Sequence, residues 1–186
     1  MNANPEFAFF ARLVESLTPW LDQVVIIGGW AHRLYRLDAR ARKLDYPPLT
    51  TLDGDVAVPP KLKDQESTVR ERLLGACFTE EFEGEDRPPA THYHYEKGGS
   101  FYAEFLAPLV GSEYDRHGKR KATMEVGGVS SQLLRYIEIL LVSPWSVALR
   151  RGIGISAFAQ ENRTGRQSDE PPGTENSHSR SAGPQR

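Results

Sequence analysis

Two adjacent glycines that end a β-branched run constrain this chain more than any other feature of its sequence. Residues 24–27 read Val-Val-Ile-Ile, Gly28 and Gly29 follow, and residues 30–37 carry the three-and-four spacing of a helix. This order predicts a strand, a tight turn and a helix. Because glycine has no side chain, backbone amides at the start of that helix can approach phosphate oxygens closely. We expect Gly28 and Gly29 to hold the phosphates of a nucleotide.

The next predicted strand carries two carboxylates on one face. Residues 52–58 alternate apolar side chains with Asp53 and Asp55, and positions i and i+2 of a strand point to the same side. Glu104, in the later strand 101–106, is the candidate for a third carboxylate beside them. Magnesium prefers oxygen ligands, so Asp53, Asp55 and Glu104 are predicted to bind two Mg²⁺ ions and to be catalytic residues.

The remaining periodicity predicts an α/β (α+β) fold in which a mixed sheet is flanked by helices. Apolar residues at spacings of three and four indicate helices, whereas β-branched or alternating runs indicate strands. Helices are expected at 7–21, 30–37 and 63–78, and strands at 24–27, 52–58, 79–82, 91–95 and 101–106. Residues 121–127 and 136–142 are candidates for further strands, although 133–141 fits a buried helix equally well.

This chain resembles the nucleotidyltransferase superfamily in two stretches, Ile26-Ile27-Gly28-Gly29-Trp30-Ala31 and Thr51-Leu52-Asp53-Gly54-Asp55. The resemblance covers residues 24–106 and is closest to minimal enzymes found among toxin–antitoxin and abortive-infection proteins. It implies a nucleotidyltransferase-like core with Mg²⁺ on three carboxylates. It also implies transfer of a nucleoside monophosphate from an NTP, ATP included, to an acceptor hydroxyl. Many members have Gly-Ser at the turn, whereas Gly29 here leaves phosphate binding to the backbone.

Other side chains have both a functional and a structural interpretation. Arg33 and Arg36 follow the glycine turn, and Arg33 is predicted to reach the nucleotide, a solvated helix face being the simpler explanation. His92 and His94 share a strand face, which suits either a zinc site or hydrogen-bonded surface histidines. Cys77, the only cysteine, is expected to be a small core residue rather than a nucleophile.

Composition narrows the choice of partners. A formal net charge of -2 and a pI near 6.2 give no electrostatic reason to expect DNA or an anionic membrane surface as a partner. The start of the chain does not read as a signal peptide, and no apolar run approaches the roughly 18 residues of a membrane span, so a cytoplasmic protein is expected. The acceptor stays open between RNA, protein and a small molecule. The basic run at 116–121 is the local candidate for contacting RNA, although such a run is usually an exposed loop.

The composition changes sharply near the C-terminus. Residues 160–186 are rich in Ser, Pro, Gly, Glu and Arg and hold no aliphatic residue larger than alanine, so we expect one domain at 1–150 and a disordered tail at 151–186. When plausible codons for 152–186 are read one nucleotide further on, 161–186 decode as an amphipathic helix with an Asn-Pro start. That helix is similar to the C-terminal helix of many nucleotidyltransferase-like proteins. A frameshifted tail is therefore one hypothesis, and it puts activity in question.

Two further interpretations compete with an active nucleotidyltransferase. The first is a non-catalytic or degenerate member of the same fold that acts as a binding or antitoxin-like partner, an interpretation that the abnormal tail favours. The second is an unrelated structural α/β domain, in which Asp53 and Asp55 would diverge in space and Glu104 would lie far from both.

Overall fold

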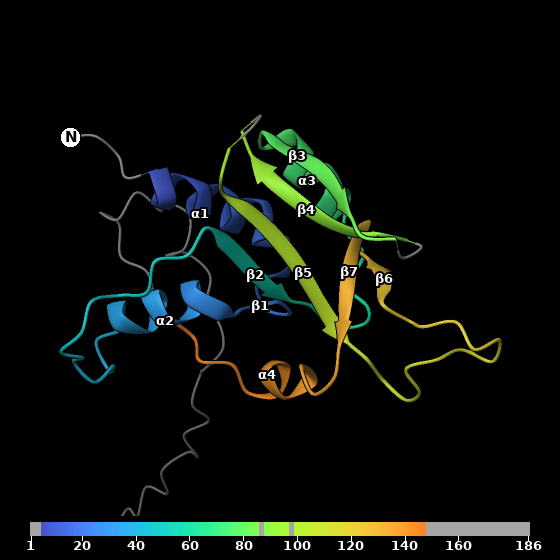
Figure 1. Cartoon of the computed structure of the whole chain (residues 1–186). Helices are drawn as coiled ribbons and strands as arrows, with labels where there is room; N and C mark the ends of the chain where they lie inside the picture. Colours follow the sequence, from blue (N-terminus) through green and yellow to red (C-terminus); the bar gives the residue numbers. More distant parts are fainter. Residues whose placement is uncertain (1–4, 86–87, 97–98, 148–186) are drawn as a thin grey trace, which may run out of the picture.

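The computed structural model of the chain describes residues 5–85, 88–96 and 99–147, which contain one mixed sheet (Figure 1). Strand β2 pairs antiparallel with β1 and parallel with β5, and β5, β4 and β3 continue the sheet as antiparallel neighbours. β7 joins β5 in parallel and carries β6 antiparallel at its side. The seven strands are β1 (Val25–Ile26), β2 (Asp53–Ala57), β3 (Phe78–Glu83), β4 (Ala90–Tyr95), β5 (Tyr102–Pro108), β6 (Thr123–Val126) and β7 (Val129–Leu134). The expected α+β class is confirmed.

One face of the sheet packs against helices and forms the main core. The helices are α1 (Pro5–Ser16), α2 (Gly28–Leu37), α3 (Val69–Gly75) and α4 (Glu138–Val142), with a short 3-10 helix at Thr18–Trp20. In Figure 1, α1 and α3 lie behind the sheet. The buried face of α1 presents Phe9, Phe10 and Leu13, all fully buried, to the sheet. Phe10 stacks on Trp30 of α2 with 4.1 Å between ring centroids, so α1 also fixes the helix whose first turn contains the two glycines.

The same alternation that buries one side of β2 directs the carboxylates to the other. Gly54 faces α1 so closely that a Cβ there would lie 2.8 Å from the Leu13 side chain. Asp53 and Asp55 therefore point away from the core. Farther along this opposite face, Ala57 and Leu106 are buried with Ile137 in a second, small apolar cluster beside α4. The face thus changes from polar to apolar along β2 and β5.

All three predicted helices begin or end at other residues. The helix expected at 30–37 already begins at Gly28, so both glycines lie in the first turn of α2. The helix expected at 63–78 covers only α3, because Thr68 starts it with a capping box: its hydroxyl accepts from the Glu71 amide while the Glu71 side chain accepts from the Thr68 amide. The helix expected at 7–21 ends as an α-helix at Ser16, and a 3-10 turn containing Pro19 follows.

Two segments and one residue of the later sequence also need comment. The segment at 136–142, left open between a strand and a buried helix, is mostly helix α4, although α4 has no buried residue. β7 was not predicted. Cys77 is exposed instead of buried, because it forms the turn between α3 and β3 with a φ of 68°. Its carbonyl accepts a hydrogen bond from the Glu96 amide.

Within the described residues, no helix has the length and apolar character needed to cross a membrane. The tail predicted at 151–186, including the frameshift hypothesis, lies outside the described residues.

Candidate active site

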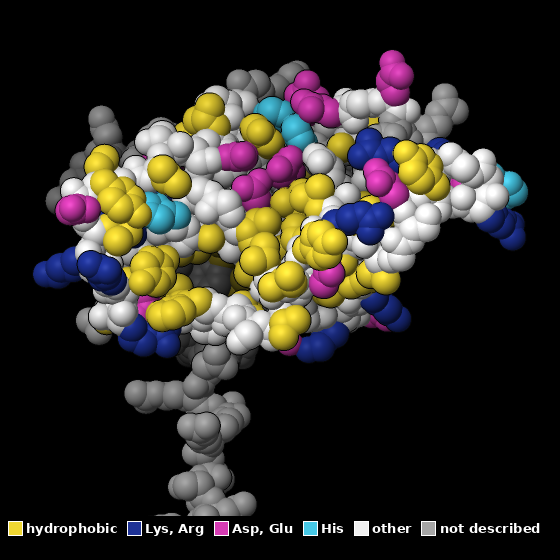
Figure 2. Space-filling model, turned by 60° about the horizontal axis from the view of Figure 1, so that its bottom comes forward, with side chains coloured by type: hydrophobic (Ala, Val, Ile, Leu, Met, Phe, Trp, Pro, Cys, Tyr) yellow, Lys and Arg dark blue, Asp and Glu magenta, His cyan; other side chains and the backbone are white. Residues whose placement is uncertain are grey.

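Parallel pairing of β2 with β5 brings the predicted carboxylates together. In this register Asp55 lies opposite Glu104 and Asp53 lies opposite Tyr102. Asp55 and Glu104 share a side-chain hydrogen bond, and Asp53 is close enough to act electrostatically on Asp55. The arrangement predicted for an unrelated structural domain, with these side chains far apart, is therefore not what the chain adopts. Figure 2 shows acidic side chains gathered beside histidines on a face that is otherwise rich in apolar side chains.

The surroundings of Asp55 disfavour its charged form. Burial of the carboxyl group, its hydrogen bond with Glu104 and the negative charges of Asp53 and Glu104 raise the pKa of Asp55 from 3.8 to about 7. Three carboxylates at this spacing repel one another unless a proton or a cation lies between them. The donor set, which consists of oxygens only, fits a hard divalent cation such as Mg²⁺.

The three carboxylates are close together, but they do not form a preformed metal site. Within residues 5–85, 88–96 and 99–147, no group of three or more His, Cys, Asp or Glu side chains has the geometry of a metal site. Asp55 and Glu104 instead bond to each other. Binding an ion between them therefore requires that this hydrogen bond open and that its proton leave.

The glycine turn lies directly against these carboxylates. Gly28 has a φ of +63°, and a Cβ on it would overlap the Asp55 carboxylate. Gly29 is also confined, although less closely, because a Cβ there would lie 2.7 Å from the Thr51 side chain. The amide of Ile27 donates to the Asp55 carbonyl at 3.0 Å, which ties the turn to β2. The glycines thus permit an approach that any side chain would prevent.

The N-terminus of α2 opens beside the acidic cluster. Ile27 is the N-cap residue and supplies no side-chain cap, so the first-turn amides of this ten-residue helix have no capping partner from it. Amides and the positive end of the helix dipole favour a phosphate there. The turn therefore combines a position for a phosphate with carboxylates suited to its counter-ion.

The sequence did not indicate how closely β4 approaches this cluster. His92 lies with its Nε2 3.2 Å from Oε2 of Glu104 and its Nδ1 3.3 Å from Oε1 of Glu83. His94 contacts Glu81 instead, with 3.1 Å between its Nε2 and the carboxylate. Period-two alternation put both histidines on one face, and Gly98-Gly99 between the strands expected at 91–95 and 101–106 predicts a hairpin turn. β4 does pair antiparallel with β5, but the sequence did not give the register that places His92 beside Glu104. No zinc site is seen at these histidines within the described residues.

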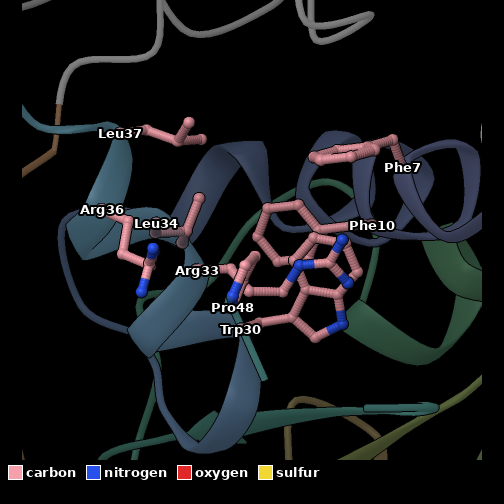
Figure 3. A pocket seen from close by; sticks show the side chains of 8 residues that line it. All are labelled: Phe7, Phe10, Trp30, Arg33, Leu34, Arg36, Leu37 and Pro48. Carbon is pink, nitrogen blue, oxygen red and sulfur yellow. The ribbon is translucent and has the colours of Figure 1, made fainter. Parts of the chain in front are cut away.

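Arg33 faces α1 in this structure. Its guanidinium pairs with Glu6 at 2.7 Å and lies over the rings of Phe7 and Trp30. It lines a pocket of about 330 Å³ between α1 and α2 (Figure 3). The lining residues are Phe7, Phe10, Trp30, Arg33, Leu34, Arg36, Leu37 and Pro48. None of the three carboxylates is among them, so this pocket is separate from the acidic cluster.

The basic run at 116–121 lies in the connection between β5 and β6. Part of its charge is already compensated, because Arg120 pairs with Glu113 at 3.0 Å. Arg116 contacts the neighbouring His117 ring at 3.1 Å. This segment is an ordered turn of the surface, closed by the bridge between Tyr114 and Arg120.

The fold and these contacts define an α+β protein in which a glycine turn and clustered carboxylates share one face of a mixed sheet. The chain belongs to the nucleotidyltransferase family, because the model of the family described as "Nucleotidyltransferase" matches residues 6–159. No curated protein and no solved structure matches the chain. Family membership confirms the resemblance read from the sequence and supports nucleotidyl transfer from an NTP as the general function.

Proposed function

We propose that this chain is a metal-dependent enzyme that transfers a nucleoside monophosphate from an NTP to an acceptor hydroxyl. The observation that carries the proposal is the contact of Gly28 with Asp55, opposite Glu104 across parallel strands. This contact joins a phosphate-binding turn to a set of metal ligands. Asp53, Asp55 and Glu104 are the proposed ligands, and Gly28 and Gly29 are the proposed phosphate contacts.

The proposed chemistry divides between binding and proton transfer. Mg²⁺ held by the three carboxylates would neutralise charge on the triphosphate and on the departing pyrophosphate. Backbone amides at the start of α2 hold the β- and γ-phosphates. The acceptor oxygen attacks the α-phosphorus, the bond from that phosphorus to the bridging oxygen of the β-phosphate breaks, and pyrophosphate leaves. Glu104 takes the proton of the acceptor hydroxyl.

Arg33 is the other residue predicted to bind the nucleotide, and in this structure it is paired with Glu6. The predicted role of Arg33 in holding the nucleotide stays a prediction, and it requires the guanidinium to exchange its partner Glu6 for a phosphate. Burial of the ion pair makes that exchange costly, because Glu6 would lose a partner in a mostly buried position. Arg33→Ala separates the two roles: loss of NTP affinity at unchanged stability supports the nucleotide contact, and loss of stability alone supports the structural one.

Calorimetric titration of each NTP into the full chain, with and without Mg²⁺, tests the proposed function. We expect binding that needs Mg²⁺ and that falls below detection in the double variant Asp53→Asn/Asp55→Asn, because both substitutions remove ligand charge. Asp64→Asn is the matched control, since Asp64 is an exposed aspartate outside the acidic cluster. Its affinity should equal that of the unmodified chain.

The same titration separates an enzyme from a non-catalytic relative. A folded chain that binds no NTP contradicts the proposal and leaves the binding or antitoxin-like partner as the better account. If NTP binds, radiolabel from an α-³²P-labelled NTP transferred to RNA, to protein or to a small-molecule fraction identifies the acceptor class.

A further inference from the structure

The His92 side chain is mostly buried and is in contact with its neighbours on several sides. Its side chain is 11% exposed, although it lies on the polar face of the sheet. The imidazole stacks on the Tyr102 ring with 4.6 Å between centroids and an interplanar angle of 18°. Glu83 and Glu104 contact its two ring nitrogens from opposite sides. These contacts leave the ring little freedom to rotate.

Glu104 receives a further contact besides those with Asp55 and His92. The side-chain amide of Gln132 on β7 donates to Oε2 of Glu104 at 3.4 Å, the same oxygen that faces His92. One contact from β4 and one from β7 therefore meet the same carboxylate oxygen. The contact from His92 is the shorter of the two, and its ring is fixed by Tyr102.

We propose that His92 is a positioning residue that holds the Glu104 carboxylate in the orientation needed to share a divalent cation with Asp55. This inference rests on the proposed function, because it assigns His92 a role only if Glu104 is a ligand. Partners of metal-binding carboxylates orient the ligand and restrict its rotation, and their loss typically costs 10- to 100-fold in metal affinity. His92 acts through Glu104 and does not touch the nucleotide.

The structure supplies a matched control on the same strand. His94 is two residues away on the same face, is partly buried, and also lies beside Tyr102, but its Nε2 contacts Glu81 instead of Glu104. A change in general stability or charge would affect both histidines alike. Only His92 reaches the proposed metal ligand.

The first test compares Mg²⁺ affinity at saturating NTP in the full chain and in His92→Ala, His92→Gln and His94→Ala. We expect His92→Ala to weaken Mg²⁺ binding about tenfold. Glutamine carries an N–H donor at the reach of the imidazole Nε2, so His92→Gln should recover most of that loss. His94→Ala should bind Mg²⁺ as the unmodified chain does. Thermal unfolding of each variant shows whether a loss of Mg²⁺ affinity is accompanied by a loss of stability.

Three results would overturn the positioning role. They are unchanged Mg²⁺ affinity in His92→Ala, no recovery in His92→Gln, and an equal loss in His94→Ala. The electron paramagnetic resonance spectrum of bound Mn²⁺ adds a readout of ligand geometry, since a displaced Glu104 changes the zero-field splitting and the line shape whereas a stability change does not.

A second test works without metal or nucleotide, so a failure of the proposed function does not hide the result. The ¹³C NMR signal of the Glu104 carboxylate, assigned with Glu104→Gln, reports its contacts directly. We expect His92→Ala to shift this signal and His92→Gln to leave it near its original position. An unmoved signal in His92→Ala contradicts the inference even in a chain that binds no NTP.

Discussion

Asp55 carries a proton at a pH where an ordinary aspartate does not. The pKa of Asp55 is raised to about 7 by burial and by the neighbouring carboxylates, whereas the unfolded value is near 3.8. The folded, metal-free chain therefore binds more protons than the unfolded chain between about pH 4 and pH 7, and its stability falls as the pH rises through that window. A cation that takes the place of the proton removes this penalty.

The raised pKa of Asp55 predicts that the affinity for Mg²⁺ depends on pH. Because the ion needs the ionised carboxylate, the Mg²⁺ affinity measured with NTP should rise about tenfold between pH 6 and pH 8. Calorimetry at pH 6 in two buffers of different ionisation enthalpy should show about one proton released per site. Asp64→Asn should keep both effects. Equal affinity at the two pH values would show that Asp55 is already ionised without metal.

The glycine turn determines how α2 starts against β2. In Gly28→Ala, the new methyl group would overlap Asp55 at a φ of +63°, a region that costs other residues about 1–2 kcal/mol before any clash. We expect the free energy of unfolding to fall by more than about 2 kcal/mol in urea titrations and NTP binding to weaken in parallel.

A second glycine at a helix end controls for this change. A Cβ on Gly75, the last residue of α3, meets no atom within 4 Å. Gly75→Ala should therefore leave stability unchanged or raise it by up to about 1 kcal/mol. Equal destabilisation by the two substitutions would mean that the close contact with Asp55 does not limit the turn.

Elements with a strong local pattern could be predicted, and weakly patterned ones could not. The glycines after a β-branched run and the alternation of Asp53 and Asp55 predicted β1, α2 and β2 correctly, because turn chemistry and side-chain alternation act over a few residues. β7 was missed because its sequence, Val-Ser-Ser-Gln-Leu-Leu, is a strand only through its pairing with β5 and β6. The apolar run that contains α4 fitted a strand and a helix equally well, so periodicity alone did not separate the two.

Some residues of the candidate site could be predicted from local sequence patterns, and others could not. Asp53, Asp55 and Glu104 could be selected from residue type and alternation, and the structure places the last two side by side. The contact of His92 with Glu104 depends on the register between β4 and β5, which the hairpin turn expected at Gly98-Gly99 did not specify. The pairing of Arg33 with Glu6 likewise depends on where α1 packs.

The chain continues past the end of its match to the family. The family match ends at residue 159, and residues 160–186 hold no aliphatic side chain larger than alanine, so they have little apolar surface to bury. We expect a chain ending at residue 159 to keep the melting temperature and the Mg²⁺-dependent NTP affinity of the full chain. Calorimetry of both chains measures this. A marked loss in the shorter chain would assign residues 160–186 a role in the fold or the site.

The parallel pairing of β2 with β5 also determines when the site forms during folding. α3 and the β3–β4 hairpin lie between the two strands in the sequence, so Asp55 meets Glu104 only after the chain has crossed over and closed a long loop. Such non-local contacts are slow to form. A chain that has folded only its N-terminal helices and the glycine turn holds the proposed phosphate contacts but no second carboxylate strand. Under the proposed function, nucleotide binding therefore depends on a non-local strand pairing, and a chain in which β2 and β5 have not paired lacks the complete site.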